Sequence, residues 1–411
     1  MNFGLLLICL HSGLVLISPA AGLDIATAIS RAVQLAPELR AAEERIASAQ
    51  GQWYQAGRWQ NPVAELRGEN WRISSDLRAD NPALDFFATI SQLFELGGKR
   101  DARRAIAWAG IDFAREQARF VRQQMAVATA SVFLNAVRVR EELQVVAEST
   151  ETVTVLHEIA RRRVTEGRLA EAEQRKLQAE LGRLATLAAE LEANQSVALQ
   201  QLRQLLREPE IEAAVLVAPT LPTPPVDSSQ DSALVEQVLQ RHPEYRAVLA
   251  EKERAQHTLE LEQARRIPDP TITGGYKRTD HRDTLVAAVV IPIPVFDTNW
   301  GNVQKATAEV AAANAGAEAI VIRLRNELLG LLTRWRSSAA RARAAQQEMV
   351  EPAASVRRAA QVAFREGSGD LLALVDAERV YLEVRRSALA SWAEATLAGQ
   401  TWLILRGDVE L

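Results

Sequence analysis

Hydrophobic and polar residues alternate in four short stretches of the chain, and this alternation predicts four β-strands. In the first stretch the apolar Ala64 and Leu66 share one face, whereas Glu65 lies on the other. A repeat of two with one apolar face is typical of a half-buried strand. The predicted strands span approximately residues 62–72, 84–96, 270–279 and 284–296.

A long helical hairpin is predicted after each pair of strands. The first spans residues 99–207 with its tip near Gly167, and the second spans 300–405 with its tip near Gly367. Apolar residues recur there at spacings of three and four, as in a helix–helix seam. The predicted seams are Ile111, Ala114, Ala118, Val121, Met125, Ala128 and Val132 in the first helix, and Leu177, Leu181, Leu184, Ala188 and Leu191 in its return helix. We expect Pro352 to kink the second long helix.

The order of these elements indicates an internal duplication. The first repeat spans residues 23–207 and the second spans 233–406, and a Pro-rich linker at 208–232 joins them. Each repeat runs helix, strand, strand, long helix, helix. The predicted fold class is therefore mainly α with a small β part, built from this duplicated unit.

Each second strand gives way to its long helix through a distinctive junction. The first junction is a Gly-Gly turn followed at once by two cations, and the second contains two prolines. A Gly-Gly pair can turn the backbone because glycine adopts positive φ angles without steric cost. The junction residues are Gly97, Gly98, Lys99, Arg100, Pro292 and Pro294.

The first 22 residues are predicted to be a secretory signal peptide. An apolar run from Phe3 to Ile17 is followed by small residues at 18–21, as in such peptides. The single cysteine, Cys9, lies in this segment, so the mature protein is expected to hold no disulfide and no thiolate metal site. Beyond residue 22 no apolar run reaches the roughly 18 residues of a membrane helix. Entry into a membrane would therefore use strands.

Composition and charge exclude several classes of function. The 411 residues carry a net charge of −4, which argues against nucleic-acid binding because that requires a basic surface. The sequence contains no Walker-type phosphate loop and no plausible catalytic triad, so we predict no enzyme and no cofactor. The histidines beyond residue 22 are scattered and predict no metal site; they are His157, His242, His257 and His281.

Four strands with one apolar face cannot span a membrane alone. Open edges would leave backbone groups unpaired in hydrocarbon, and membrane barrels begin at about eight strands. Two chains would supply an eight-stranded barrel, which its own side chains fill. Three chains would leave room for a conduit. A conduit therefore favours a trimer with twelve strands, whose length of about ten residues fits the wall of an outer-membrane barrel, and the helices would then form a tube on the other side.

Tryptophans gather near the ends of the predicted strands, where membrane barrels carry an aromatic girdle. They are Trp53, Trp59, Trp71 and Trp300. Trp53 and Trp59 precede the first strand, and packing between helices explains them equally well.

Charged residues crowd both hairpin tips. Glu171 and Asp370 begin the return helices, where the helix dipole favours an acid whatever the function. In an oligomer, copies of either residue would also ring an opening with charge, as at pore mouths. They are therefore candidates for the lining of such an opening.

The whole layout of residues 24–406 resembles the TolC-like outer membrane efflux proteins. Ile90 to Arg100 is similar to the strand-to-helix junction of the CzcC-like, heavy-metal (cobalt-zinc-cadmium) branch of that family. Glu166-Gly167 and Phe364 to Gly367 resemble the family's hairpin tips. Pro292 to Phe296 resembles its second junction.

The resemblance implies a homotrimeric duct through the lipid of the outer membrane of a Gram-negative bacterium. In such a duct a 12-stranded outer-membrane β-barrel is continued by a long periplasmic α-helical barrel. Its tips would meet a periplasmic adaptor, or membrane fusion protein, linked to an inner-membrane RND pump. Solute would pass passively, with heavy-metal cations as the expected cargo. The implied docking residues are Gly167, Arg168, Leu169, Gly367, Ser368 and Leu371, and the implied aperture residues are Glu171 and Asp370.

Three other interpretations stay open. An efflux duct for organic toxicants or drugs would have the same layout. A periplasmic adaptor or coiled-coil scaffold would carry one hairpin between Gly-rich β halves, whereas this chain has two hairpins and two strand pairs. A secreted filament subunit would not need the strand pairs.

Overall fold

The computed structural model describes residues 22–70, 85–279 and 282–408, and all structural statements concern these residues. Most of the predicted signal peptide and Trp71 lie outside them. The chain forms two compact units, each built from both sequence repeats. The hairpin unit comprises residues up to 32, 129–222 and 338–397, and the sheet unit comprises 33–128, 223–337 and the residues from 398 onward.

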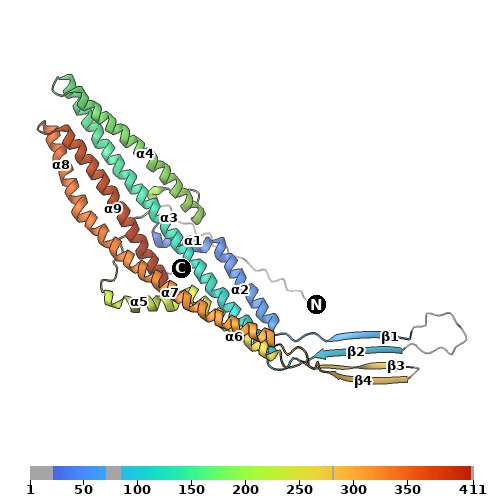
Figure 1. Ribbon diagram of the computed structural model, residues 1–411. Coiled ribbons are helices and arrows are strands. Elements are labelled where there is room, and N and C mark those ends of the chain that lie inside the picture. The colour runs from blue at the N-terminus through green and yellow to red at the C-terminus, as the bar shows by residue number, and fades with distance from the viewer. Residues whose placement is uncertain (1–21, 71–84, 280–281, 409–411) are drawn as a thin grey trace, which may run out of the picture. The chain divides into compact units, whose positions relative to one another are not determined.

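The sheet unit contains one four-stranded antiparallel sheet in the order β1-β2-β3-β4 (Figure 1). Its strands are β1 (Val63–Glu69), β2 (Asp85–Leu93), β3 (Thr271–Thr279) and β4 (Arg282–Val290). The register places Ala64 opposite Ile90, Ile90 opposite Gly274, and Gly274 opposite Ala287. Within the described chain, β1 and β4 each pair on one side only. The sheet therefore ends in two open edges.

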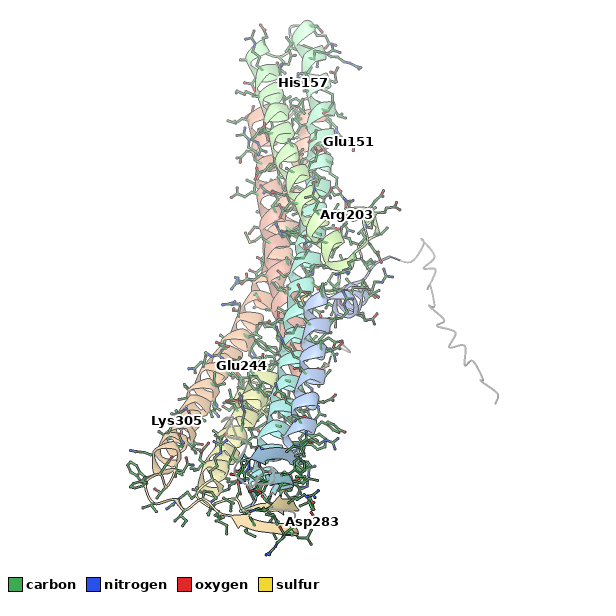
Figure 2. The ribbon with its side chains drawn as sticks, turned by 90° about the vertical axis from the view of Figure 1, so that its right-hand side faces the viewer. Glu151, His157, Arg203, Glu244, Asp283 and Lys305 are labelled. Atoms are coloured by element: carbon green, nitrogen blue, oxygen red, sulfur yellow. The ribbon has the colours of Figure 1, made fainter. Side chains whose placement is uncertain are left out.

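The two faces of this sheet differ in chemistry, because residues directly opposite in antiparallel strands share a face. One face carries Ala64, Leu66, Phe86, Ala88, Ile90, Ile272, Leu285, Ala287 and Val289. The other is mostly polar and carries Glu65, Arg67, Glu69, Thr89, Ser91, Thr273, Lys277 and Thr284, together with the apolar Val63, Phe87, Leu93, Val286, Ala288 and Val290. The apolar face becomes polar at the strand ends far from the helices, where the Tyr276 hydroxyl donates to Asp283. Asp283 is labelled on the sheet in Figure 2. Leu285 on the apolar face is 90% exposed, so none of the described residues covers this part of the face.

The fourth strand differs from its predicted bounds at both ends. It begins at Arg282 rather than Thr284, and it ends at Val290 rather than near residue 296. The hydrophobic alternation does continue beyond Val290, but Pro292 and Pro294 have no N–H group to donate to a neighbouring strand. Alternation alone therefore overestimated the length of this strand.

Helices flank the strand pairs in the predicted order. Before the strands lie α1 (Ile25–Leu35), α2 (Pro37–Ala56), α5 (Asp231–Arg241) and α6 (Pro243–Ala264). After them lie α3 (Lys99–Thr165), α4 (Glu171–Leu206), α7 (Trp300–Ala344), α8 (Glu351–Glu366) and α9 (Leu371–Arg406). Two single 3₁₀ turns, η1 (Ala213–Val215) and η2 (Ser228–Gln230), lie in the predicted linker. With 67 residues, α3 is on the order of 100 Å long.

The second long helix, in which a kink at Pro352 was predicted, is interrupted directly before that residue. A π-helical segment, η3 (Ala345–Val350), separates α7 from α8, and Pro352 occupies the first turn of α8. Proline has no N–H to bond the carbonyl of Glu348, four residues earlier. The wider turn immediately before it accommodates this missing bond.

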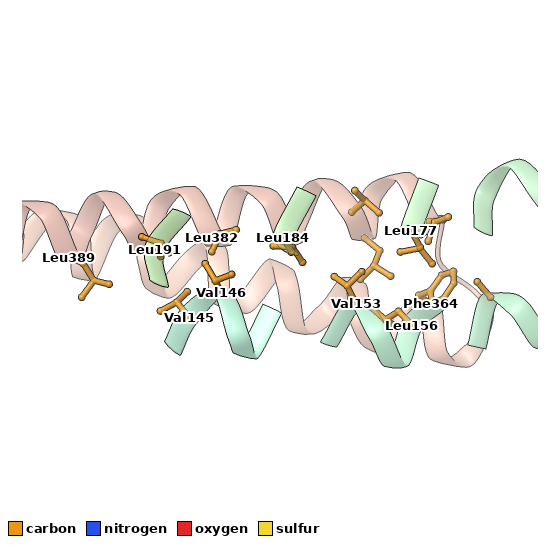
Figure 3. Close-up of a cluster of buried hydrophobic side chains, with 14 of the residues drawn as sticks. Val145, Val146, Val153, Leu156, Leu177, Leu184, Leu191, Phe364, Leu382 and Leu389 are labelled. Atoms are coloured by element: carbon orange, nitrogen blue, oxygen red, sulfur yellow. The ribbon is translucent and has the colours of Figure 1, made fainter. Parts of the chain in front are cut away.

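Leucines and valines form the core of the hairpin unit (Figure 3). Leu177, Leu184 and Leu191 of α4 are buried there, so the seam predicted for this helix is confirmed. They join a cluster whose other buried members are Val139, Val145, Val146, Val153, Leu156 and Ala160 of α3, Phe364 of α8, and Leu371, Leu374, Val375, Leu382 and Leu389 of α9. Each large aliphatic side chain buried in this way stabilises the unit by roughly 1.5–3 kcal/mol.

The seam predicted along α3 is wrong in its second half. Ile111 and Ala118 are buried as expected, but Ala128 is exposed. The buried residues of this stretch are instead Ala126, Ala130, Phe133, Leu134, Ala136 and Val137. A straight helix with 3.6 residues per turn drifts away from a strict repeat of 3.5, so one seam cannot follow a helix of this length.

Candidate functional site

The first hairpin tip, between α3 and α4, turns on Gly167. Its φ angle is +69°, a value that glycine adopts without the steric cost of a side chain. The Gly167 N–H donates to the Val164 carbonyl at 3.0 Å, and the Arg168 N–H donates to the Arg163 carbonyl at 2.8 Å. This pair of bonds is a Schellman motif, which satisfies the last carbonyls of a helix.

The second tip, between α8 and α9, repeats the same motif at Gly367. Here φ is +81°, and the Gly367 N–H and Ser368 N–H donate to the carbonyls of Phe364 and Ala363. Gly369, which sequence reasoning did not single out, is also required by space. A Cβ atom at Gly369 would lie 2.8 Å from the Phe364 nitrogen.

Arg163 joins the two tips, a contact that sequence reasoning missed. Its Nη2 donates to the Arg365 carbonyl at 3.0 Å. Its guanidinium carbon lies 4.9 Å from the centre of the Phe364 ring, within the range of a cation–π interaction. Because α3 ends beside Arg163, this one side chain holds both tips together.

The predicted docking residues divide into exposed and buried positions. Gly167, Arg168, Gly367 and Ser368 are exposed. Leu169 is half-buried against the core of the hairpin unit. The sixth residue, Leu371, is only 2% exposed and belongs to that core. Within the chain its side chain is covered, so it supports the tip from beneath.

The two aperture candidates are exposed at the starts of their helices. Glu171 forms an ion pair with Arg175 at 2.7 Å, and both side chains are more than half exposed. Asp370 is exposed directly before α9, and its backbone carbonyl accepts a bond from the Leu374 N–H. Neither carboxylate is engaged in the buried core of the chain.

Sequence reasoning also missed three buried carboxylates below the tips. Glu142, Glu180 and Glu378 are each 3% exposed or less. Each binds at least one arginine that lies on another helix. Glu142 pairs with Arg386, Glu180 with Arg379, and Glu378 with Arg357.

Glu180 has the most complete set of partners. Arg183 and Arg379 contact it at 2.6 and 2.7 Å. Burial by itself would raise the pKa of Glu180, but the hydrogen bonds from both guanidiniums lower it below its usual value. The signal in the sequence is weak: Glu180 stands between Leu177 and Leu184 at the spacing of the seam.

In the sheet unit, the first strand-to-helix junction has the conformation that its glycines allow. Gly97 and Gly98 have φ angles of +73° and +77°. Lys99 is buried, and its Nζ lies 2.6 Å from a carboxylate oxygen of Asp269, beside the start of β3. Arg100 instead places its guanidinium carbon 4.6 Å from the centre of the Trp59 ring.

No group of three or more His, Cys, Asp or Glu could hold a metal ion in the part of the chain that the structure covers; His157, for example, lies on α3 in the hairpin unit (Figure 2). None of the described helices is long and apolar enough to cross a membrane.

Several known proteins are similar to this chain in sequence or in fold. Residues 234–398 match the family of outer membrane efflux proteins. The chain is 28% identical over 376 residues to the cobalt-zinc-cadmium resistance protein CzcC of Cupriavidus metallidurans, covering 89% of this chain and 86% of that protein. It is 24% identical over 298 residues to the nickel-cobalt-cadmium resistance protein NccC of Alcaligenes xylosoxydans xylosoxydans, covering 71% and 65%. The outer-membrane channel OprN has a similar fold, with a TM-score of 0.77 at 16% identity over 93% of this chain and 89% of that one.

These matches confirm the resemblance to outer membrane efflux proteins and the predicted outer-membrane location. The mainly helical fold with a small antiparallel sheet is that of outer-membrane channels. The matched family consists of efflux proteins rather than enzymes, so the prediction that this chain is not an enzyme is also confirmed.

Proposed function

We propose that this chain, with its outer membrane efflux segment at residues 234–398, is the channel component of a tripartite RND-type efflux system. Three copies form the duct. It conducts solute passively from a pump and adaptor in the periplasm to the exterior, and its cargo is heavy-metal cations.

The two-faced sheet with open edges is the observation that carries this proposal. Among the residues that the structure describes, nothing covers its apolar face, and β1 and β4 each have one unpaired side. In hydrocarbon those backbone groups need partners. Pairing of β4 with β1 of the next copy supplies them, and three copies close a twelve-stranded barrel whose polar face lines the interior.

The tips support docking of a periplasmic adaptor. Gly167, Arg168, Gly367 and Ser368 are exposed there, and Arg163 holds the two turns together. We propose that the exposed turns contact the adaptor. Leu169 and Leu371 fix their shape from below, and Glu171 and Asp370 of three copies charge the aperture.

Replacing both tip glycines tests this assignment. Gly167→Val with Gly367→Val forces a β-branched residue into a positive φ angle, at a cost of about 1–3 kcal/mol for each turn. We expect trimers to persist while co-purification with the adaptor and export are lost. The matched control is Gly182→Val with Gly316→Val, since these helical glycines face open space. Unchanged adaptor binding by the tip variant would contradict the docking assignment.

The proposed cargo follows from the heavy-metal resistance proteins to which the chain is similar. Deletion of the gene, followed by growth on a panel of metal salts and organic toxicants, tests it. Sensitivity to cobalt, zinc, cadmium or nickel salts is the expected result. Sensitivity confined to organic compounds would contradict the proposed metal cargo, but it would still agree with an efflux duct. Recovery of the mature chain in the soluble periplasm without detergent would contradict the duct itself.

A further inference from the structure

Three arginines lie on aromatic rings where the helices of the sheet unit meet the sheet. Arg58 lies 3.8 Å from the centre of the Tyr54 ring. Arg100 and Arg104, one helical turn apart on α3, lie 4.6 and 5.1 Å from the rings of Trp59 and Trp53. Distances in this range are those of stacked cation–π pairs.

These three guanidiniums differ from most other arginines of the sheet unit in having no carboxylate within ion-pair distance among the described residues. Nearby Arg103 and Arg115 pair with Glu95 and Asp112. A guanidinium that stacks on a ring keeps its N–H edge free, and that edge matches the oxygens of a phosphate. We refer to Arg58, Arg100 and Arg104 together as the cluster. Arg58 lines a hollow with Glu95 and Arg103, and Arg104 lines a second hollow with Glu253. Each residue of the cluster presents an unneutralised guanidinium that could bind a phosphate.

The cluster adjoins the apolar face of the sheet. Phe94 continues the alternation of that face by one position beyond β2, where its N–H still donates to the Pro270 carbonyl at 2.9 Å. The Phe94 ring lies 6.4 Å from the ring of Trp59, which also carries Arg100. One continuous surface thus passes from aliphatic residues through two aromatic rings to free guanidiniums.

The aromatic rings also fix the position of the cluster on the helices. Trp53 packs edge-on against Trp108 at 6.0 Å, and the Arg104 side chain crosses the backbone at Gly57. Glu253 and His257 of α6 share a hollow of about 310 Å³ with Trp53 and Arg104. No ion pair joins Glu253 to Arg104 in the described structure, so the Arg104 guanidinium stays available.

We infer that this surface binds the phosphate of an anionic phospholipid in the periplasmic leaflet of the outer membrane. The acyl chains lie on the apolar face near Phe94, the rings occupy the level of the headgroups, and the guanidiniums hold the phosphate. A phospholipid matches the surface in both parts, its apolar chains and its anionic head. A second protein chain would need an acidic patch beside an apolar one. The inference depends on the outer-membrane location and is independent of the cargo.

Lipid binding by the full-length protein in detergent tests the inference. Native mass spectrometry would count phosphatidylglycerol molecules retained per oligomer, with phosphatidylcholine as the zwitterionic comparison. We expect retention of phosphatidylglycerol, weakened about tenfold or more in the triple variant Arg58→Gln, Arg100→Gln, Arg104→Gln. The control removes three paired cations of the same unit by Arg254→Gln, Lys305→Gln and Arg325→Gln. A variant with lysine at the three cluster positions keeps the charge without the planar fork, and we expect it to restore binding only in part.

Several results would overturn the inference. Equal retention of the two lipids by the unchanged protein would show that binding does not depend on an anionic headgroup. If the control variant lost as much lipid binding as the cluster variant, the loss would be due to the lower net charge of the protein and not to these three arginines. Release of the bound lipid by millimolar inorganic phosphate would indicate a free-anion site instead. Dissociation of the oligomer by the cluster variant in phosphatidylcholine would make this surface an interface between copies.

Discussion

Glu180 provides the sharpest test of how the hairpin unit is held together. Its carboxylate is 1% exposed and joins Arg183 of its own helix, α4, to Arg379 of α9. Glu180→Gln keeps the shape of the side chain and removes its charge. We expect this variant to weaken the attachment of α4 to α9 and to lower the melting temperature of the helices.

The magnitude follows from the exposure of the partners. Removing one member of a fully buried ion pair costs about 3–5 kcal/mol, because the remaining charge loses its partner. The side chains of Arg183 and Arg379 are 42% and 55% exposed, so water hydrates them in the variant. We therefore expect a loss of about 1–3 kcal/mol. For a unit of this size each kcal/mol lowers the melting temperature by about 2–4 °C.

The assay is thermal unfolding of the detergent-solubilised protein, followed by the helical circular dichroism signal at one fixed scan rate. Glu171→Gln is the matched control on the same helix, since its ion pair with Arg175 is exposed. We expect no measurable shift for the control. Equal melting temperatures for the two variants would refute the role of the buried pair.

The stability that Glu180 contributes should depend on pH in a definite direction. The pKa of Glu180 lies below its usual value in the folded chain. A lowered carboxylate pKa contributes stability above the unfolded pKa of about 4.3, and that stability is lost as the pH falls through the folded pKa. The difference between the unchanged protein and Glu180→Gln should therefore be constant near neutrality and shrink below about pH 4. A difference that grows in acid would contradict the assignment.

Two further predictions concern the sheet, each with a matched neighbour. A Cβ atom at Gly275 would lie 2.3 Å from the Ala88 carbonyl oxygen, whereas Gly274 faces open space. Gly275→Ala should therefore cost about 1–3 kcal/mol and reduce the yield of assembled protein in outer-membrane fractions, while Gly274→Ala assembles normally; equal yields would contradict the β2–β3 register. Leu285→Arg places a cation on the apolar face at a cost of about 2–4 kcal/mol in a bilayer and should reduce heat-stable oligomers on gels, whereas Thr284→Arg on the opposite face should not. If Thr284→Arg reduced the oligomers and Leu285→Arg did not, the assignment of the two faces would be wrong.

Local patterns made the strands and the hairpin turns predictable. A period of two needs only neighbouring residues, so all four strands were found, and Gly167 and Gly367 were found because a tight helix end favours glycine. The end of β4 was missed for a different reason. The apolar alternation continues past Val290, but a ladder of hydrogen bonds cannot pass Pro292.

Contacts between distant segments could not be predicted. From its position in the sequence, Leu371 was expected at the surface of a tip. It is buried because it packs in one cluster with Phe364 and with residues of the other hairpin. Glu180 was missed because charged residues are almost always exposed unless paired, and its partner Arg379 lies on α9, in the other repeat. The stacking of Arg100 and Arg104 likewise depends on rings from α2 and the segment after it.

Closure of the sheet between copies is the central claim, and disulfide cross-linking of its open edges tests it most directly. Cysteines would be placed in pairs on the polar face, one in β1 at Glu65 or Arg67 and one in β4 at Thr284 or Val286. After mild oxidation in native outer membranes, we expect covalent products of two and three chains and none larger on a denaturing gel. Chains that stay monomeric with every pair, or a ladder that continues beyond three, would contradict a trimeric barrel.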